Sequence, residues 1–241
     1  MDDLNILYED RDIIVVVKPV GVDSQSSQGL SPDMVSMIKN HLSDGSDEPY
    51  VGVVHRLDRP TSGIMVFAKS REAAAALSKQ IQEGSMDKTY MAAICGQLKG
   101  DSGRLEDYLA QDDKTNLSRV VTSKDKGAKK ATLEYQVLKK KYIEGERISL
   151  VRVHLLTGRH HQIRVQMAHA GTPLIGDHKY NPIFNRVDDK GKNIRPDGFF
   201  GKDMCTSLAL CSSTLAFTHP KSRKKMHYSI EPEGELWSIF K

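Results

Sequence analysis

The residue pattern that predicts secondary structure changes near Tyr90, and this change constrains the fold more than any other feature of the sequence. Beyond Tyr90 the sequence consists of short pieces rich in β-branched and aromatic residues, separated by turns rich in glycine or lysine. Such pieces predict strands at residues 90–95, 132–138, 148–155 and 208–217. Because no helical pattern alternates regularly with these pieces, parallel βαβ units are not expected, and neighbouring strands should run antiparallel.

The part before Tyr90 contains both helices and strands. A β-branched run at residues 13–17 predicts a buried strand. Ser31 followed by Pro32 is typical of a helix start, and residues 71–83 are alanine-rich with apolar residues four positions apart. Together the two parts predict an α+β fold, in which helices flank one extended, mainly antiparallel mixed sheet.

Composition places the chain among ordinary globular proteins. Of its 241 residues, 39% are hydrophobic and 27% are charged, which suffices for a buried core. No apolar run approaches the roughly 20 residues of a membrane helix, and nothing resembles a secretory signal. The 3 cysteines lack CxxC spacing, so neither a disulfide framework nor a cysteine zinc site is expected. We expect a reduced, cytoplasmic protein that does not interact with membranes.

Basic residues are concentrated in the later part of the chain. The formal net charge is only +4, but acidic residues outnumber basic ones in the first 54 positions, so the remainder is more basic than the total suggests. Residues 116–141 hold 8 basic and 2 acidic residues and end in the run Lys139, Lys140 and Lys141. Lysine runs are usually solvated surface, but this distribution favours contact with a nucleic acid.

The densest polar cluster precedes an apolar stretch. It reads His-Arg-Leu-Asp-Arg-Pro-Thr-Ser-Gly at residues 55–63, with Asp58 between Arg56 and Arg59. Neighbouring guanidinium groups favour an ionised carboxylate, which in a dry pocket can act as a nucleophile or base. By spacing alone, an ordinary Asp–Arg turn is the alternative. A protein-kinase catalytic loop is excluded, because a leucine interrupts His-Arg-Asp and no Asp-Phe-Gly follows.

A second polar cluster at residues 157–166 contains Arg159, Gln162, Arg164 and Gln166. These donors suit the recognition of phosphate or carboxylate, and a polar helix face is the alternative. The nearby histidines do not predict a metal site: His160 and His161 are adjacent, so we expect their side chains to point to different sides.

Tyr90 follows Lys88 and Thr89 at the start of the first predicted strand after the change of pattern. Such a tyrosine can pack in a core, as most do, or stack on a nucleobase, which stabilises binding by about 1–3 kcal/mol per base. The residue types alone leave both functions open.

These clusters resemble the motifs of the RluA-type RNA pseudouridine synthases. Residues 55–63 match the family's HRLDRxTSG motif, and residues 157–180, TGRHHQIRVQMAHAGTPLIGDHKY, are similar to its TGRxHQIRVHLAxxGxPIxGDxxY block. The Lys-Pro-Val-Gly turn at residues 18–21, Lys88-Thr89-Tyr90 and the segment 208–220 also agree, in the same order. The resemblance covers nearly the whole chain, and the two long motifs are highly specific.

The resemblance implies a reaction and assigns its residues. Uridine in a structured RNA, ribosomal or transfer RNA, would be isomerised to pseudouridine. Asp58 matches the family's catalytic aspartate, acting at the sugar by attacking C1′ or by removing the C2′ proton. Arg56 matches the arginine that enters the RNA helix as the target nucleotide leaves it. Tyr90 matches the tyrosine that packs on the flipped uracil and takes part in proton removal at C5, and Arg164 matches the arginine that pairs with the aspartate.

Further expectations accompany these roles. The family's fold has a central cleft, and residues 1–241 would form a single catalytic domain without an N-terminal S4 domain. No metal, cofactor or nucleotide is implied, because the reaction needs no redox step. We expect a monomer. Two positions depart from the family pattern, His160 for the usual threonine and Gln166 for a frequent histidine. Additional RNA contacts are expected from the remaining motif donors and the lysine run: His55, Arg59, Arg159, Gln162, Lys139, Lys140 and Lys141.

Two other functions compete with this one. A non-catalytic RNA-binding protein on the same scaffold would tolerate Asp58→Asn, and the joint presence of Asp58, Tyr90 and Arg164 argues against it. A glycoside-type hydrolase needs paired carboxylates, and Asp58 has no acidic partner in a motif.

Overall fold

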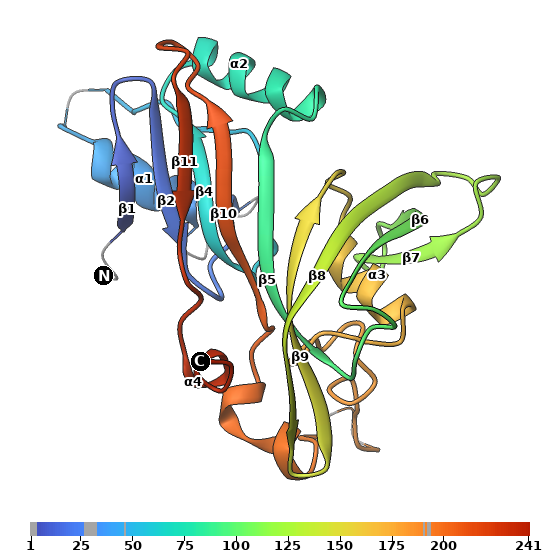
Figure 1. Cartoon of the computed structure of the whole chain (residues 1–241). Coiled ribbons are helices and arrows are strands. Elements are labelled where there is room, and N and C mark those ends of the chain that lie inside the picture. The colour runs from blue at the N-terminus through green and yellow to red at the C-terminus, as the bar shows by residue number, and fades with distance from the viewer. Residues whose placement is uncertain (1–3, 27–32, 46, 190, 192–193) are drawn as a thin grey trace. The chain divides into compact units, whose positions relative to one another are not determined.

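The computed structural model describes residues 4–26, 33–45, 47–189, 191 and 194–241 (Figure 1). The chain divides into two compact units. The N-terminal unit comprises residues 1–88 and 211–231, and the C-terminal unit comprises residues 89–210 and 232–241. No helix in the described part of the chain is long and apolar enough to cross a membrane.

The N-terminal unit is built on a mixed sheet with two helices. Its elements are β1 (Asn5–Glu9), β2 (Ile13–Lys18), α1 (Met34–Leu42), β3 (Gly52–Val53), β4 (Ser62–Ala68), α2 (Arg71–Gln82), β10 (Leu210–Thr218) and β11 (Lys225–Ser229). Strand β2 pairs antiparallel with β1 and with β4, and β11 pairs antiparallel with β10. Strands β4 and β10 pair in parallel, which makes the sheet mixed.

Burial of the β-branched run forms the core of this unit. Ile13 and Val15 of β2 and Ile64 and Val66 of β4 are fully buried, and they pack with apolar residues of α2 and β10. Helix α2 confirms the predicted helix at 71–83 and is capped by Ser70, whose side chain accepts from the backbone of the helix's first turn. The predicted start at Ser31 and Pro32 lies outside the described residues; the described helix α1 follows Asp33, its N-cap.

The C-terminal unit is built on antiparallel strands. They lie in the order β5-β9-β8-β6-β7, namely β5 (Asp87–Cys95), β9 (Glu146–Leu155), β8 (Lys129–Ile143), β6 (Ser102–Asp112) and β7 (Leu117–Val121). The short helices are α3 (Gln162–His169), the 3-10 turns η1 (Gly198–Gly201) and η2 (Asp203–Cys205), and α4 (Glu235–Ser238). Since β4 and β10 form the single parallel pairing described between strands of the same unit, the predicted α+β class with a mainly antiparallel sheet is confirmed. The central cleft stays a prediction.

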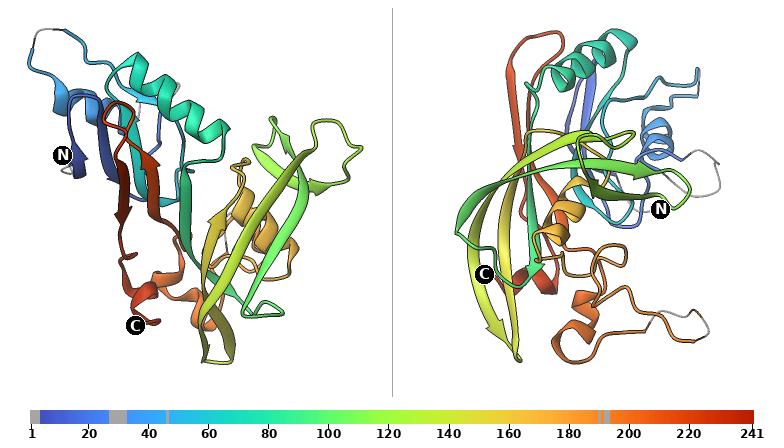
Figure 2. Two further views of the ribbon diagram at one scale, coloured as in Figure 1. Left: turned by 45° about the horizontal axis from the view of Figure 1, so that its top comes forward. Right: turned by 90° about the vertical axis from the view of Figure 1, so that its right-hand side faces the viewer.

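Two apolar clusters of described residues contribute to the core of the C-terminal unit. Aromatic side chains of the irregular segments, among them Phe184, Phe199 and Phe200, cover β5 and β9. Helix α3 lies against strands β6 and β8 of the same unit, where Val165 packs on Leu109 of β6 and Ala131 of β8 (Figure 2). The remaining buried positions of α3 are largely polar, so its packing brings charged and amide groups onto the strands.

Candidate active site

Asp58 lies in the loop that precedes β4 in the N-terminal unit. Its side chain is half-buried, Leu57 beside it is buried, and Arg56 and Arg59 are exposed. The backbone N–H of Thr61 donates to the carbonyl oxygen of Asp58 at 2.9 Å, which closes a tight turn after the aspartate. The loop therefore presents a carboxylate at the edge of a buried strand, flanked by two exposed guanidinium groups.

Gly63 permits the close approach of a second strand to this loop. Its φ is 121°, and a Cβ atom there would lie 2.4 Å from the carbonyl oxygen of Ser212. Since Gly63 of β4 and Ser212 of β10 are paired in the sheet, any side chain would push the two strands apart. The close packing of β4 and β10 thus explains why the motif ends in glycine.

Lys18, at the end of β2, is hydrogen-bonded to the loop that contains Asp58. Its side chain is fully buried. The ammonium group donates three hydrogen bonds to backbone carbonyl oxygens, those of Pro19 (2.8 Å), Val22 (2.6 Å) and Arg59 (3.1 Å). Desolvation lowers the pKa of Lys18 to about 8, against the opposing effect of the Asp23 and Asp58 carboxylates. Asp58 is therefore within electrostatic reach of a buried cation.

His55, predicted as an RNA contact, is half-buried and bonded to the neighbouring strand. Its Nε2 accepts a hydrogen bond from the backbone N–H of Val66 at 3.2 Å. Desolvation, with a smaller contribution from the Lys88 ammonium, lowers the pKa of His55 to about 3. The imidazole is thus neutral at physiological pH and cannot pair with a phosphate as a cation. Its contact with RNA stays a prediction.

Tyr90 lies on β5, in the C-terminal unit. It is paired with Val153 of β9, and Val153 is paired in turn with Tyr135 of β8. Directly paired residues point to the same face of a sheet, so Tyr90 shares its face with Leu133, two positions before Tyr135. Only 6% of Tyr90 is exposed, which fits a ring held in place by its neighbours.

Arg164 lies on α3 and is bound to an aspartate that the sequence did not single out. Its Nε donates to Asp177 Oδ2 at 2.8 Å, and its second terminal nitrogen donates to Oδ1 at 2.7 Å. Both side chains are almost fully buried. The guanidinium carbon also lies 5.2 Å from the ring centroid of Tyr180, a cation–π geometry. Such a bidentate pair fixes the orientation of the guanidinium plane.

The expectation that His160 and His161 point to different sides is wrong. Their rings are stacked, with centroids 3.7 Å apart and an interplanar angle of 30°. The cause is the backbone of His161, whose φ of 53° is left-handed and turns its side chain toward its neighbour. Ser118 Oγ is 2.8 Å from His160 Nδ1, and the Tyr180 hydroxyl is 2.7 Å from His161 Nδ1. The pair therefore connects the start of α3 to β7 and Tyr180.

Gln162 organises the turn before α3, and its two polar ends are occupied within the protein. Its Oε1 accepts from the backbone N–H of Arg159 at 3.0 Å and from the Thr157 hydroxyl at 2.8 Å. Its Nε2 donates to the carbonyl oxygen of Thr132 at 3.0 Å. Arg159 is exposed, although its Nε donates to the Lys130 carbonyl oxygen, so this guanidinium retains donors for a ligand.

Comparisons with known proteins agree with this arrangement of motifs. The model of the RNA pseudouridylate synthase family matches residues 12–169. The chain belongs to this family. It is 33% identical to an uncharacterized RNA pseudouridine synthase of Aquifex aeolicus, over 98% of the chain and 72% of that protein. It is 32% identical to the dual-specificity RNA pseudouridine synthase RluA of Yersinia pestis, over 95% of the chain and 98% of that protein.

A solved structure shows the same fold. Human RNA pseudouridylate synthase domain containing 4 matches 98% of the chain, with a TM-score of 0.75 and 21% identity. The relatives place the chain among the RluA-type enzymes, which confirms the resemblance drawn from the two long motifs. The protein is an RNA pseudouridine synthase, an isomerase that converts uridine to pseudouridine.

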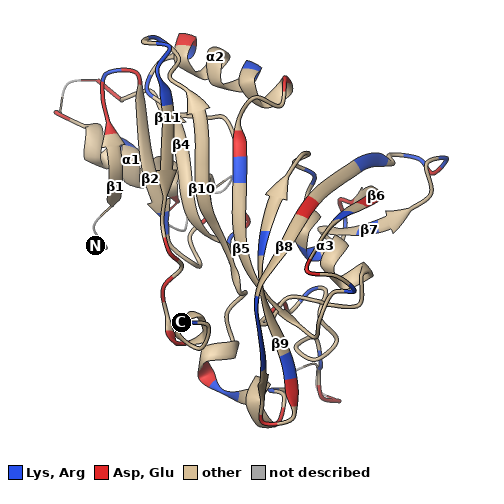
Figure 3. Ribbon diagram, viewed as in Figure 1, with Lys and Arg blue, Asp and Glu red and all other residues tan. Residues whose placement is uncertain are grey.

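The lysine run of this synthase lies on β8, a strand that carries both blue and red segments in Figure 3. Lys139, Lys140 and Lys141 are all exposed. Lys139 Nζ donates to the carbonyl oxygen of Lys241 at 3.0 Å, and Lys140 pairs with Asp101 at 2.5 Å. Both ammonium groups are already partly neutralised or bonded, so their contact with RNA stays a prediction.

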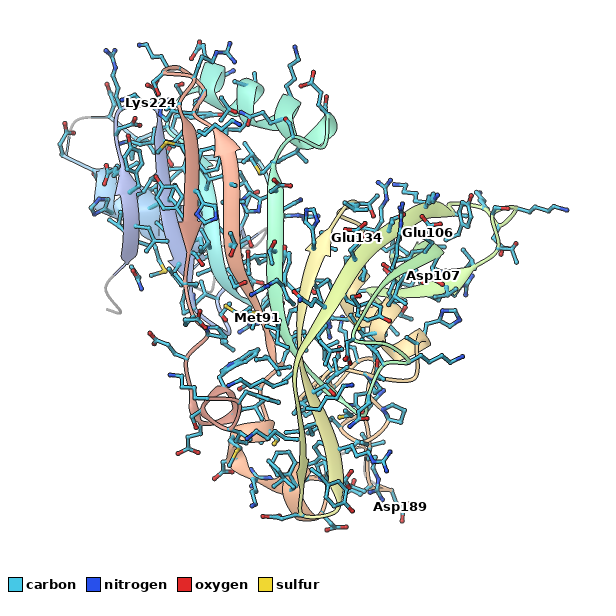
Figure 4. The ribbon with its side chains drawn as sticks, viewed as in Figure 1. Met91, Glu106, Asp107, Glu134, Asp189 and Lys224 are labelled. Atoms are coloured by element: carbon cyan, nitrogen blue, oxygen red, sulfur yellow. The ribbon has the colours of Figure 1, made fainter. Side chains whose placement is uncertain are left out.

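Carboxylates also moderate the charge of the hairpin strands. Figure 4 labels Glu106 on β6 and Glu134 on β8. Glu106 pairs with Arg104 at 2.8 Å and lies 3.5 Å from Lys130, and Glu134 lies 3.9 Å from His154. This surface is of mixed sign, so the excess of basic residues in the sequence overstates how positive it is.

One group of side chains in the described residues has metal-ligand chemistry: Asp10, Asp12 and His219. His219 Nδ1 accepts from the backbone N–H groups of Lys221 and Ser222, which leaves Nε2 to donate to Asp10 Oδ2 at 2.8 Å. Both ring nitrogens are thus used, and the group fastens the β10–β11 turn to the end of β1.

Proposed function

We propose that Asp58, Tyr90 and Arg164 act on the same uridine of a structured ribosomal or transfer RNA. The observation that carries this proposal is the half-buried Asp58 carboxylate in the loop that carries the family motif, where the carbonyl oxygen of the next residue, Arg59, accepts from the buried Lys18 ammonium. A buried uridine first leaves the base stack, which costs a few kcal/mol. The exposed Arg56 is available to fill the gap that it leaves.

The reaction conserves every atom of the nucleotide. Asp58 either attacks C1′ as the bond from uracil N1 to C1′ breaks, which forms an ester, or removes the C2′ proton as that bond breaks, which forms a C1′–C2′ double bond. The uracil rotates and a bond forms from C5 to C1′, which displaces the Asp58 carboxylate from the ester or returns the proton from Asp58 to C2′. The C5 proton then leaves and N1 is protonated. Tyr90 packs against the uracil and takes part in the removal of the C5 proton. Arg164, oriented by Asp177, supplies the positive charge that stabilises the ionised Asp58.

Five further assignments belong to this proposal. The two units work as one catalytic domain, which is supported by a family match that extends across residue 88. RNA contacts come from His55, Arg59, Arg159, Gln162 and the lysine run. Some relatives are named ribosomal large subunit pseudouridine synthases, which supports ribosomal RNA as a substrate. The enzyme acts as a monomer, and an RNA substrate supports the cytoplasm as its location.

Asp58→Asn tests the central assignment, because it keeps the side chain's shape and removes its charge. The substrate is total RNA, labelled with [5-³H]uridine, from cells that lack the gene, and tritium release reports the loss of the C5 proton. We expect a rate at least about 1,000-fold below wild type, since a nucleophile or base is lost. Asp47→Asn, the same change at an exposed position of the same unit, should retain full activity.

The outcomes distinguish the rival functions. Full activity of Asp58→Asn would contradict the catalytic role of Asp58, and RNA binding without tritium release in wild type would favour a non-catalytic RNA-binding protein. Release of free uracil would indicate a hydrolase. Mapping pseudouridines in RNA from cells with and without the gene then identifies the target, because the missing position should reappear when wild-type protein is restored.

A further inference from the structure

A buried serine outside the family motifs contacts the residue next to Asp58. Ser24 lies between the Lys-Pro-Val-Gly turn and α1, and only 4% of it is exposed. Its Oγ donates to the carbonyl oxygen of Leu57 at 2.8 Å and accepts from the backbone N–H of Leu57 at 3.0 Å. One hydroxyl group thus satisfies both backbone polar groups of a single residue, which uses its one proton and one of its two lone pairs.

The backbone on the other side of Asp58 is held from the same segment. The carbonyl oxygen of Arg59 accepts from Lys18 Nζ at 3.1 Å and from the backbone N–H of Gly21 at 2.9 Å. The Nε of Arg59 donates back to the Gly21 carbonyl oxygen at 2.9 Å. Asp58 therefore lies between two residues whose backbone groups are held, Leu57 by Ser24 and Arg59 by Lys18 and Gly21.

Ser24 is itself anchored to a helix. The backbone N–H of Met34, the first residue of α1, donates to the carbonyl oxygen of Asp23 at 2.9 Å. Asp33 accepts from the backbone N–H of Ser26 with one carboxylate oxygen and from Ser36 with the other, each at 2.8 Å. The residues on both sides of Ser24 are thus bonded to the start of α1, so the hydroxyl is a fixed point for the loop.

We propose that Ser24 is a positioning residue of this synthase, which holds the Asp58 carboxylate in its reactive orientation through Leu57. The inference rests on the proposed role of Asp58. Leu57 carries no reacting group, so loss of the Ser24 hydroxyl leaves the chemistry intact and frees the loop to move. Displacements of about 1 Å in a catalytic group can slow a reaction about 100-fold. The loss should appear in the rate of the bound complex and not in RNA affinity.

Two substitutions of equal shape test this proposal, since Ser24→Thr keeps the hydroxyl and Ser24→Val replaces it by a methyl group. Single-turnover tritium release is measured with saturating full-length enzyme on [5-³H]uridine-labelled total RNA from cells that lack the gene. We expect Ser24→Val to be about 10- to 100-fold slower than wild type, with Ser24→Thr within about threefold. RNA dissociation constants should stay within about twofold for both. Ser24→Ala provides the same loss of the hydroxyl without added volume.

Ser149→Val is the matched control. Ser149 is fully buried in the C-terminal unit, and its Oγ donates to the Gly96 carbonyl oxygen at 2.8 Å. It should lose stability as Ser24→Val does and keep its single-turnover rate. Equal slowing by Ser24→Thr and Ser24→Val would assign the effect to volume and overturn the proposal. So would a rate within about threefold of wild type for both Ser24→Val and Ser24→Ala.

Amide hydrogen exchange at Leu57 separates this proposal from the assignment of Asp58. Loss of the Ser24 acceptor should speed exchange of that amide at least about tenfold in Ser24→Ala, whatever residue performs catalysis. Unchanged exchange would show that Ser24 does not hold the loop. Faster exchange and slower reaction, together with full activity of Asp58→Asn, would show that the loop positions another group and that the Asp58 assignment is wrong.

Discussion

The Asp58 loop and the Arg164 helix hold their charged groups by different means. The loop is held mainly through its backbone: Ser24 bonds Leu57, and Lys18 and Gly21 bond the carbonyl oxygen of Arg59. Arg164 is held through its side chain, by two hydrogen bonds to Asp177.

This difference separates what each region tolerates. Backbone contacts leave the side chain of Arg56 exposed, so this residue can change without releasing the loop. A buried ion pair behaves otherwise, because removal of one partner leaves an uncompensated charge out of water. We therefore expect that breaking the Arg164–Asp177 pair lowers the free energy of unfolding. Breaking a contact of the Asp58 loop should mainly misalign the Asp58 carboxylate.

The largest effect is expected for Asp177→Ala. It leaves the Arg164 guanidinium buried without its bidentate partner and should lower the free energy of unfolding by about 3–5 kcal/mol. Urea unfolding at neutral pH measures this loss. The matched control is Asp203→Ala, which breaks an exposed pair with Arg195 and should cost less than about 1 kcal/mol. Equal losses of unfolding free energy in both variants would show that the buried Arg164–Asp177 pair stabilises the protein no more than an exposed pair does.

A smaller, pH-dependent effect is expected for Lys18→Met. The pKa of Lys18 is about 8 in the folded protein and 10.5 when unfolded, so the unfolded chain binds more protons between these values. Wild-type stability relative to the variant should therefore rise by about 3 kcal/mol as the pH increases from 8 to 10.5. Urea unfolding across this window measures the change, and Lys99→Met, at an exposed lysine, should show none. A flat difference would mean that Lys18 is not desolvated.

The smallest effect is expected for the exposed lysine run. Replacing Lys139, Lys140 and Lys141 by glutamine should reduce the salt dependence of RNA binding, by about 0.7–0.9 in the logarithmic slope for each lysine that contacts a phosphate. Affinity for the total RNA substrate, measured at several salt concentrations, gives the slope. Glutamine replacement of Lys79, an exposed lysine on α2 of the N-terminal unit, serves as a control. An unchanged slope in the triple variant would show that the run faces solvent.

Sequence patterns predict the parts of this fold that depend on local signals. The β-branched run at β2, the alanine-rich α2 and the strands β5, β8 and β9 all carry such signals, and the structure confirms them. Strand β6 was missed because its burial is low along most of its length, so its residues do not alternate between apolar and polar. Helix α3 lacks an apolar stripe because its buried positions include Arg164 and Gln166.

The residues of the candidate site likewise differ in whether a local signal in the sequence reveals them. Motif residues such as Asp58 are visible in the sequence because the whole segment matches a specific pattern. Asp177 was missed although it lies inside the second motif block, because its contact with Arg164 spans 13 positions. Ser24 lies in a polar loop where a serine carries no signal, and only its burial and its two bonds to Leu57 reveal it.

The pairing of Gly63 with Ser212 has a consequence for biosynthesis. The strand that lies against the Asp58 loop is separated from it by the whole of residues 89–210, so it leaves the ribosome long after the loop itself. The N-terminal unit cannot close its sheet during translation of that intervening stretch. A nascent chain of this synthase is therefore expected to be inactive until β10 has emerged, which delays its first encounter with RNA as an enzyme until residues 89–210 have been translated.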